Sequence, residues 1–322
     1  MADSVGIPAA ASRGDWLANK SVHPSSPAGI CLAAFEKLSC GESAWLGEAG
    51  TESRSTSTRS SPEASIFVRT GGSTGNPRFA HHTWATMAAA VEGLREVLGK
   101  EPICSWCCLP VWHVGGWMQV VRAVETGGDI VFGDYLDLAE PKAEVNLSGR
   151  MVSLVSTQLH RLLFSNLAVA RLRESRLILL GGGPLHEDLA GRARNSELPL
   201  APTYGLTETA GAVTFLPPER FLSGDDGVGP ALPHAELSLV EETKTLSIRG
   251  QSLCLGYEDC DFPARAWFPT ADLAEQAKNG NWRILGRIDR VVNTGGEKVN
   301  PAEVEAVIRE TGLADDCLVL GL

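Results

Sequence analysis

The stretch LILLGGGPL, residues 177–185, is a short apolar run that ends in three glycines and a proline. Such a run is typical of a buried strand, and the pattern over 186–195 predicts a helix directly after the turn. The same order of strand and helix recurs before it. Strands are expected at 65–68, 103–109, 129–132 and 151–155, and helices at 82–99, 116–124 and 158–164. Strands that alternate with helices predict an α/β domain with a largely parallel sheet.

The pattern differs on both sides of this region. Residues 1–50 have weak periodicity with one short helix expected at 30–38, and the Ser/Thr-rich stretch 51–63 is typical of an exposed loop or linker. Beyond Pro217, half-buried antiparallel strands are expected, followed by a helix and a last strand. These elements are expected at 245–250, 281–286, 300–309 and 317–322.

Composition excludes several classes of protein. The 322 residues are 43% hydrophobic and carry a net charge of −11, which argues against a nucleic-acid binder because such proteins need basic surface. No run of about 18 apolar residues occurs, so no membrane span is expected. The N-terminus lacks the basic start and apolar run of a signal peptide, which favours a cytoplasmic location.

The eight cysteines include a CxxCC cluster formed by Cys104, Cys107 and Cys108. A zinc site is one interpretation, but no second pair follows at the spacing of a zinc ribbon. The cluster also lies within the strand expected at 103–109. Reduced core thiols are therefore the favoured interpretation.

A glycine- and hydroxyl-rich turn, TGGSTGNPR at residues 70–78, follows the strand expected at 65–68. Glycines let backbone amides turn inward, hydroxyls add donors and Arg78 adds positive charge, a combination suited to a polyphosphate. The Gly-Lys-Ser/Thr ending of the phosphate-binding loop of P-loop NTPases is absent. For this segment alone, a flexible turn is the alternative. The candidate contacts are Thr70, Gly72, Ser73, Thr74, Gly75 and Arg78.

Together with four later blocks, this turn resembles the motifs of the adenylate-forming superfamily of acyl-CoA synthetases, luciferases and peptide-synthetase adenylation domains. The later blocks are GGGPL (181–185), YGLTE (204–208), WFPTADL (267–273) and GRID (286–289), which continues into GGEKVNPAEVE (295–305). The resemblance implies a large α/β domain with mixed sheets flanked by helices. It divides the chain into an N-terminal segment with a linker (1–64), an AMP-binding core (65–288), and a hinge with the incomplete start of a small α+β domain (289–322).

The resemblance also implies a role for each matched residue. An aromatic ring for adenine, a hydroxyl for the α-phosphate and a carboxylate for Mg²⁺ would be supplied by Tyr204, Thr207 and Glu208. Asp272 would accept hydrogen bonds from the ribose hydroxyls, and Arg287 would bind ribose or phosphate. Thr207, Glu208 and Arg287 are then the catalytic residues and Asp289 is the hinge. The glycines that let the nucleotide and acyl group approach the backbone would be Gly181, Gly182, Gly183 and Gly205.

Three residues depart from the motifs of the family. Gly71, Arg78 and Ala271 stand where relatives usually have Ser, Lys and Gly. Relatives also place a lysine for adenylation in a Gly-Lys segment well beyond the hinge, and no such segment follows Asp289; Lys298 is not its equivalent. We therefore expect these 322 residues to bind nucleotide but to form the adenylate weakly or not at all.

Members of this family consume ATP with Mg²⁺, a small carboxylic acid and CoA. Residues 109–123, 152–163 and 177–185 are most similar to the o-succinylbenzoate–CoA ligases of menaquinone biosynthesis. His113, Thr157 and Gln158 would line the acyl pocket, although His113 could equally be a buried core histidine. A ligase for another aryl or fatty acid, and a non-catalytic nucleotide-binding remnant, are the alternatives.

Overall fold

A five-stranded parallel sheet forms the centre of the molecule in the computed structural model, in the order β6–β5–β7–β8–β9. The structure describes residues 14, 15, 17, 23–47, 50–51, 64–71, 78–294, 297–311 and 317–320. The strands of this sheet are β5 (Ser105–Cys107), β6 (Ile130–Phe132), β7 (Met151–Leu154), β8 (Leu177–Leu180) and β9 (Leu200–Pro202). The expected parallel α/β architecture is therefore confirmed, although β5 is shorter than the strand predicted at 103–109.

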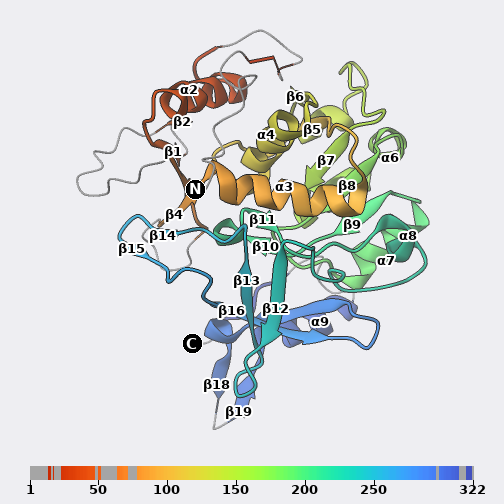
Figure 1. The fold of residues 1–322 in the computed structure, drawn as a ribbon. Helices are drawn as coiled ribbons and strands as arrows, with labels where there is room; N and C mark the ends of the chain where they lie inside the picture. The colour runs from red at the N-terminus through yellow and green to blue at the C-terminus, as the bar shows by residue number, and fades with distance from the viewer. Residues whose placement is uncertain are drawn as a thin grey trace.

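Helices cover both faces of this sheet, because successive side chains of its strands point to opposite sides. On one face, Leu177 and Leu179 of β8 pack with Leu94 of α3. On the other face, Ile178 and Leu180 pack with the second group of helices. The helices are α3 (Trp84–Leu98) and α4 (Val114–Thr126) on the first face, and α5 (Ser156–Leu162), α6 (Asn166–Arg173), α7 (Glu187–Asn195) and α8 (Pro218–Leu222) on the second (Figure 1).

A second, mixed sheet has the order β15–β14–β4–β3–β1–β2 and joins distant parts of the chain. Strand β1 pairs in parallel with β3. Phe35 of the preceding helix meets Trp84 edge-on and stacks on Trp117, both at 5.5 Å between ring centroids. The described part of residues 1–64 thus shares its core with the domain that follows. These elements are α2 (Pro27–Ser39), β1 (Ala44–Gly47), β2 (Gly50–Thr51), β3 (Ser65–Arg69), β4 (Phe79–Thr83), β14 (Gly256–Tyr257) and β15 (Cys260–Asp261).

The third sheet, in the order β12–β13–β16–β17, is antiparallel throughout, as its sequence pattern predicted. A two-stranded ribbon and a helix follow it at the lower end of Figure 1. The strands are β12 (Ala235–Leu239), β13 (Thr245–Gly250), β16 (Phe268–Gln276) and β17 (Trp282–Arg287), then β18 (Val292–Thr294), β19 (Glu297–Val299) and helix α9 (Pro301–Glu310).

The strand predicted at 317–322 is wrong where the structure describes it, because residues 317–320 are not in a strand. An apolar run forms a strand only when a neighbouring strand takes its backbone hydrogen bonds. Here the amide of Val319 donates instead to the carboxylate of Glu305 at 3.0 Å, and Arg290 donates to its carbonyl at 3.5 Å.

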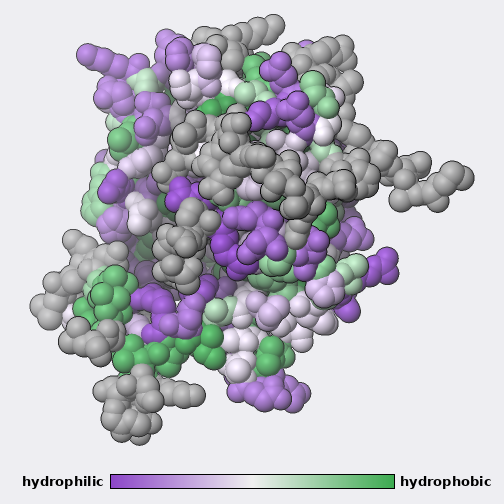
Figure 2. Space-filling model, turned by 90° about the vertical axis from the view of Figure 1, so that its left-hand side faces the viewer, coloured by the Kyte–Doolittle hydropathy of each residue, from purple (hydrophilic) through white to green (hydrophobic). Residues whose placement is uncertain are grey.

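Exposed large hydrophobic side chains gather near the end of the described chain. Figure 2 shows hydrophobic groups in the lower part of the face that it presents, where Figure 1 places the C-terminal elements. The exposed large hydrophobic residues of the C-terminal elements are Leu285, Ile288, Val307, Leu318 and Leu320. No helix among the described residues is both long and apolar enough to cross a membrane.

Candidate functional site

Two residues predicted from separate motifs, Tyr204 and Arg287, lie within hydrogen-bond distance of a third, Asp272. Tyr204 follows β9, Asp272 lies in β16, and Arg287 ends β17 opposite Asp272 in the register of the two strands. The Tyr204 hydroxyl donates to Oδ2 of Asp272 at 2.6 Å, and Nη1 of Arg287 donates to Oδ1 at 3.3 Å. The Asp272 side chain is 9% exposed, against 42% for Arg287. The carboxylate is therefore fixed by two donors at the edge of two sheets.

Burial, followed by the neighbouring Asp272 carboxylate, raises the pKa of Tyr204 well above its usual range. The phenol consequently keeps its proton and acts as a donor to Asp272.

Asp289 forms a two-bond ion pair with Arg287, at 2.9 Å from Nε to Oδ1 and 2.6 Å from Nη2 to Oδ2. The guanidinium holds the pKa of Asp289 below its ordinary value. Asp289 lies in the 3₁₀ turn η3 (Ile288–Arg290), which leads into β18. Its role as a hinge stays a prediction.

Thr207 and Glu208 lie in a single 3₁₀ turn, η2 (Thr207–Thr209), between the short strands β10 (Gly205–Leu206) and β11 (Gly211–Ala212). The hydroxyl of Tyr257 donates to Oε1 of Glu208 at 2.8 Å. The guanidinium carbon of Arg78 lies 3.5 Å from the centroid of the same tyrosine ring, an arrangement typical of a cation–π contact. Tyr257 therefore links the predicted metal carboxylate to the predicted phosphate-binding cation.

Sequence reasoning did not identify Tyr257, although tyrosine is a rare residue in this chain. The chain has three tyrosines, and two of them, Tyr204 and Tyr257, donate to site carboxylates. Burial, then Glu208, raises the pKa of Tyr257 above its ordinary value, so its hydroxyl also stays a donor.

The turn at 70–78 is closed at its base by Thr70 and Arg78. The amide of Thr70 donates to the carbonyl of Arg78 at 2.8 Å, and its hydroxyl lies 3.2 Å from the same oxygen. Gly72, Ser73, Thr74 and Gly75 lie outside the described residues, so their phosphate contacts stay predictions.

At two of the predicted positions after β8 and β9, the backbone itself requires glycine. Gly182 has φ +76°, a conformation that favours glycine. A Cβ on Gly205 would lie 1.9 Å from the carbonyl oxygen of Gly211, so no other residue fits the β10–β11 ribbon. Gly181 donates to the carbonyl of Leu154 at 3.2 Å, and Gly183 is exposed.

The residues expected to line the acyl pocket follow β5 and β7, on the same edge of the sheet as Gly181. His113 is exposed at the start of α4, so its interpretation as a buried core histidine is wrong. Thr157 is exposed, and Oε1 of Gln158 accepts from the amide of Val155 at 3.1 Å, which caps α5. Contact of these side chains with an acid stays a prediction.

Arg122 is a buried cation that sequence reasoning missed. It lies in α4, is 9% exposed, and its Nε is buried without a hydrogen-bond partner in the described part of the chain. Met118, one turn earlier on the same helix face, lies 3.8 Å from the position of a Cβ on Gly211, beside the Glu208 turn. Burial lowers the pKa of Arg122 to about 10, which leaves it charged near neutral pH. Such a charge needs an anion.

The donor set suits Mg²⁺ better than a transition metal. In the described residues, no group of three or more His, Cys, Asp and Glu side chains could enclose a metal ion. Mg²⁺ commonly binds through one or two carboxylates, water and substrate phosphates, which a lone Glu208 beside a phosphate site would satisfy.

The CxxCC cluster consists of free thiols, of which Cys107 is buried and Cys104 and Cys108 are half-buried. Cys107 Sγ donates to the carbonyl of Leu109 at 3.4 Å, and Cys108 Sγ to that of Ser153 at 3.7 Å. Burial raises the pKa of Cys107 to about 12, so the thiol is protonated and a poor metal ligand.

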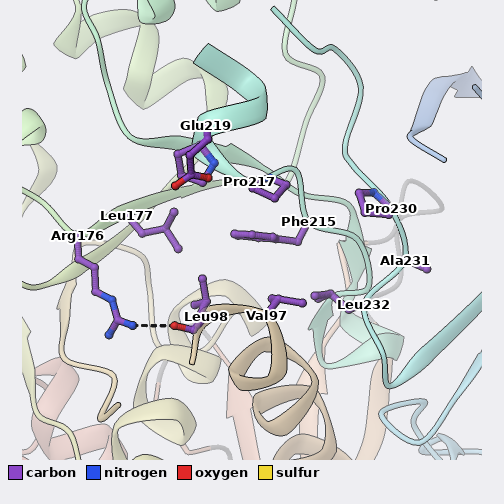
Figure 3. Close-up of a pocket in the computed structure, with 11 residues that line it drawn as sticks. Val97, Leu98, Arg176, Leu177, Phe215, Pro217, Glu219, Pro230, Ala231 and Leu232 are labelled. Carbon is purple, nitrogen blue, oxygen red and sulfur yellow. Dashed lines mark hydrogen bonds between the residues drawn. The ribbon is translucent and has the colours of Figure 1, made fainter. Parts of the chain in front are cut away.

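A separate cavity of about 290 Å³ lies away from these residues. Arg176 and Leu177, at the start of β8, form part of its wall, and Arg176 donates to the carbonyl of Leu98 (Figure 3). Gly181 follows the other end of the same strand. Because the two ends of β8 lie at opposite edges of the sheet, the cavity is not part of the candidate site.

A family model described as "AMP-binding enzyme" matches residues 18–257. The 2-succinylbenzoate–CoA ligase of Listeria monocytogenes serotype 4b is 28% identical over 271 residues, which cover 80% of this chain and 56% of that protein. A probable 2-succinylbenzoate–CoA ligase of Mycobacterium tuberculosis is 30% identical over 273 residues, covering 81% and 67%.

Among solved structures, the o-succinylbenzoate–CoA synthetase of Bacillus subtilis in complex with ATP and magnesium matches with a TM-score of 0.68 and 25% identity. The match covers 80% of this chain and 57% of that one. The same synthetase with its acyl-adenylate intermediate gives 0.69. The chain therefore spans little more than half the length of the first of these relatives.

Proposed function

The chain belongs to the AMP-binding enzyme family, and we propose that it binds ATP with Mg²⁺ and serves the activation of a carboxylic acid for transfer to CoA. The observation that carries this proposal is the convergence of Tyr204, Asp272 and Arg287 from three strands and turns. A buried carboxylate held between a phenol and a guanidinium is suited to accept the two hydroxyls of a ribose.

We assign the remaining groups by their place around this cluster. Tyr204 offers its ring to adenine, Thr207 its hydroxyl to the α-phosphate, and Glu208 its carboxylate to Mg²⁺, which would neutralise charge on the phosphates. Arg78 and the turn that it closes would bind the outer phosphates. The acid carboxylate attacks the α-phosphate, pyrophosphate leaves, and the thiol of CoA then displaces AMP. Positioning and charge neutralisation drive both steps, so no protein nucleophile is required.

For the acid we propose o-succinylbenzoate. The names of the relatives support this choice, and so does Arg122. The acid carries two carboxylates, so one can react while the other pairs with a buried cation. A fatty acid has a single carboxylate and would leave Arg122 without an anion. A cytoplasmic location stays a prediction.

Calorimetry on the purified 322-residue chain tests nucleotide binding first, with ATP in the presence of Mg²⁺ and with ATP in the presence of EDTA. Binding that Mg²⁺ strengthens supports the proposal, and no binding of either form refutes it. A second titration, in saturating Mg²⁺ and α,β-methylene-ATP, compares o-succinylbenzoate with benzoate and octanoate. Equal affinity for all three would refute the choice of acid while leaving the nucleotide site intact.

Replacement of Tyr257 by phenylalanine should weaken the binding of Mg²⁺–ATP about tenfold, because a hydrogen bond to a charged group contributes about 1.5 kcal/mol or more. The phenylalanine ring still lies under Arg78, so the change isolates the hydroxyl that positions Glu208. Tyr135→Phe is the matched control, since that hydroxyl bonds to Arg161 away from the site. Unchanged affinity in Tyr257→Phe would show that Glu208 does not need this donor.

A further inference from the structure

His82 connects the strand that leaves the predicted phosphate-binding turn to the turn that carries Thr207 and Glu208. It is the fourth residue of β4, and its side chain is fully buried. Nε2 lies 2.8 Å from the carbonyl oxygen of Thr207, which is 125 residues away in sequence. Nδ1 lies 3.0 Å from the hydroxyl of Thr86.

The partners of the ring determine which nitrogen carries its proton. A carbonyl oxygen only accepts hydrogen bonds, so Nε2 must donate to Thr207. Burial lowers the pKa of His82 to about 4, and the ring is therefore neutral near pH 7, with Nδ1 as an acceptor. The hydroxyl of Thr86 faces Nδ1, and the same oxygen lies 2.9 Å from the carbonyl oxygen of Thr83. The ring is thus held at both nitrogens in a single orientation.

Each partner of His82 belongs to a rigid element. Thr86 forms a capping box with Thr83 at the start of α3, so the Nδ1 side is tied to the N-terminus of a buried helix. Thr207 opens η2, the turn that presents the predicted α-phosphate hydroxyl and metal carboxylate. The only other described donor to its carbonyl is the amide of Ala210, at 3.2 Å, within the same turn. Of these two donors, only His82 comes from the second sheet.

We propose that His82 is a positioning residue that sets the spacing between strand β4, which follows Arg78, and the Thr207–Glu208 turn, so that a triphosphate and its Mg²⁺ are held by Arg78, Thr207 and Glu208 at once. This inference rests on the proposed function, because it requires that the chain binds Mg²⁺–ATP. The imidazole has no role in the chemistry itself, because its two nitrogens are engaged by Thr207 and Thr86.

The neighbouring histidine supplies a matched control. His81 is also buried, but it points to the other face of β4, where its ring stacks on Phe67 at 4.7 Å and its Nε2 lies 2.8 Å from Oγ of Ser65. Replacing it removes a buried imidazole from the same strand without touching Thr207.

The test measures the affinity of the wild type, His82→Leu and His81→Leu for Mg²⁺–ATP, ATP with EDTA, and adenosine. We expect His82→Leu to bind Mg²⁺–ATP about tenfold more weakly. Its affinity for adenosine, which needs only the Tyr204–Asp272 side of the site, should stay within about twofold, and His81→Leu should match the wild type. A purely structural role would lower all three affinities of His82→Leu together, and that result would overturn the inference.

Two conservative variants decide the question if His82→Leu does not fold. The amide nitrogen of glutamine reaches about as far as Nε2 and can donate to Thr207, whereas asparagine is too short. His82→Gln should therefore restore the binding of Mg²⁺–ATP and His82→Asn should not, and equal affinities in the two variants would overturn the inference. A wild-type chain that binds no Mg²⁺–ATP would instead refute the proposed function, and with it the need for this residue.

Discussion

Replacement of Asp272 by alanine is expected to lower the affinity for ATP by about two orders of magnitude. The change removes a nearly buried carboxylate that would accept both ribose hydroxyls, and each charge-assisted hydrogen bond contributes about 1.5–3 kcal/mol. It also leaves the Tyr204 hydroxyl without its acceptor and Arg287 with Asp289 as its ion-pair partner among the described residues. Calorimetric titration with ATP, and with adenosine to isolate the ribose contribution, measures the effect.

The same region contains a matched carboxylate for comparison. Asp226 pairs with Arg283 of β17, at 2.7 and 2.6 Å from its two oxygens, but its side chain is 52% exposed and lies outside the site. Asp226→Ala should bind ATP as the wild type does, because an exposed ion pair contributes little. If both variants lost affinity equally, or if Asp272→Ala retained it, the assignment of Asp272 to the ribose would be wrong.

Replacement of Arg122 by methionine should weaken the binding of o-succinylbenzoate about a hundredfold while making the folded protein more stable. Truncating one partner of a buried, hydrogen-bonded charge pair typically costs about 2–5 kcal/mol of binding energy. Without the acid, however, Nε of this buried guanidinium has no hydrogen-bond partner among the described residues. Its removal should raise the free energy of unfolding by about 1–3 kcal/mol. Titration in saturating α,β-methylene-ATP and unfolding in urea measure the two effects.

Arg171 is the contrasting arginine. Its guanidinium donates to four backbone carbonyls, those of Asp137, Leu138, Glu140 and Ala143, and no acid is expected near it. Arg171→Met should therefore lower the free energy of unfolding by about 2 kcal/mol and leave the affinity for the acid unchanged. An Arg122→Met protein that is less stable, yet binds o-succinylbenzoate normally, would show that Arg122 is a structural residue.

Several site residues were predictable because a short motif already contains their chemistry. Tyr204, Asp272 and Arg287 each stand in a recognisable segment, and the structure brings all three together. Arg122 was missed, even though an arginine in the apolar helix VGGWMQVVRAVET is a visible signal, because helical arginines are usually solvated. His82 offered no local signal at all. A histidine in a buried strand is more often a core residue, and its partner Thr207 is 125 residues away.

The central strands and helices followed from local pattern, because hydrophobic periodicity and turn residues depend on neighbours within a few positions. The apolar run at 317–320 met the same local criterion, but it is not a strand because the Glu305 carboxylate takes the amide of Val319. Conversely, the sequence of β1 gives little indication of a strand. It forms one because β3 of the second sheet takes its backbone hydrogen bonds. The contacts that assemble the site arise where the mixed sheet packs against the η2 turn. Tyr257 lies between Arg78 and Glu208, and His82 donates to Thr207. These contacts depend on how separately formed elements pack in space, and residue spacing along the chain does not specify that packing.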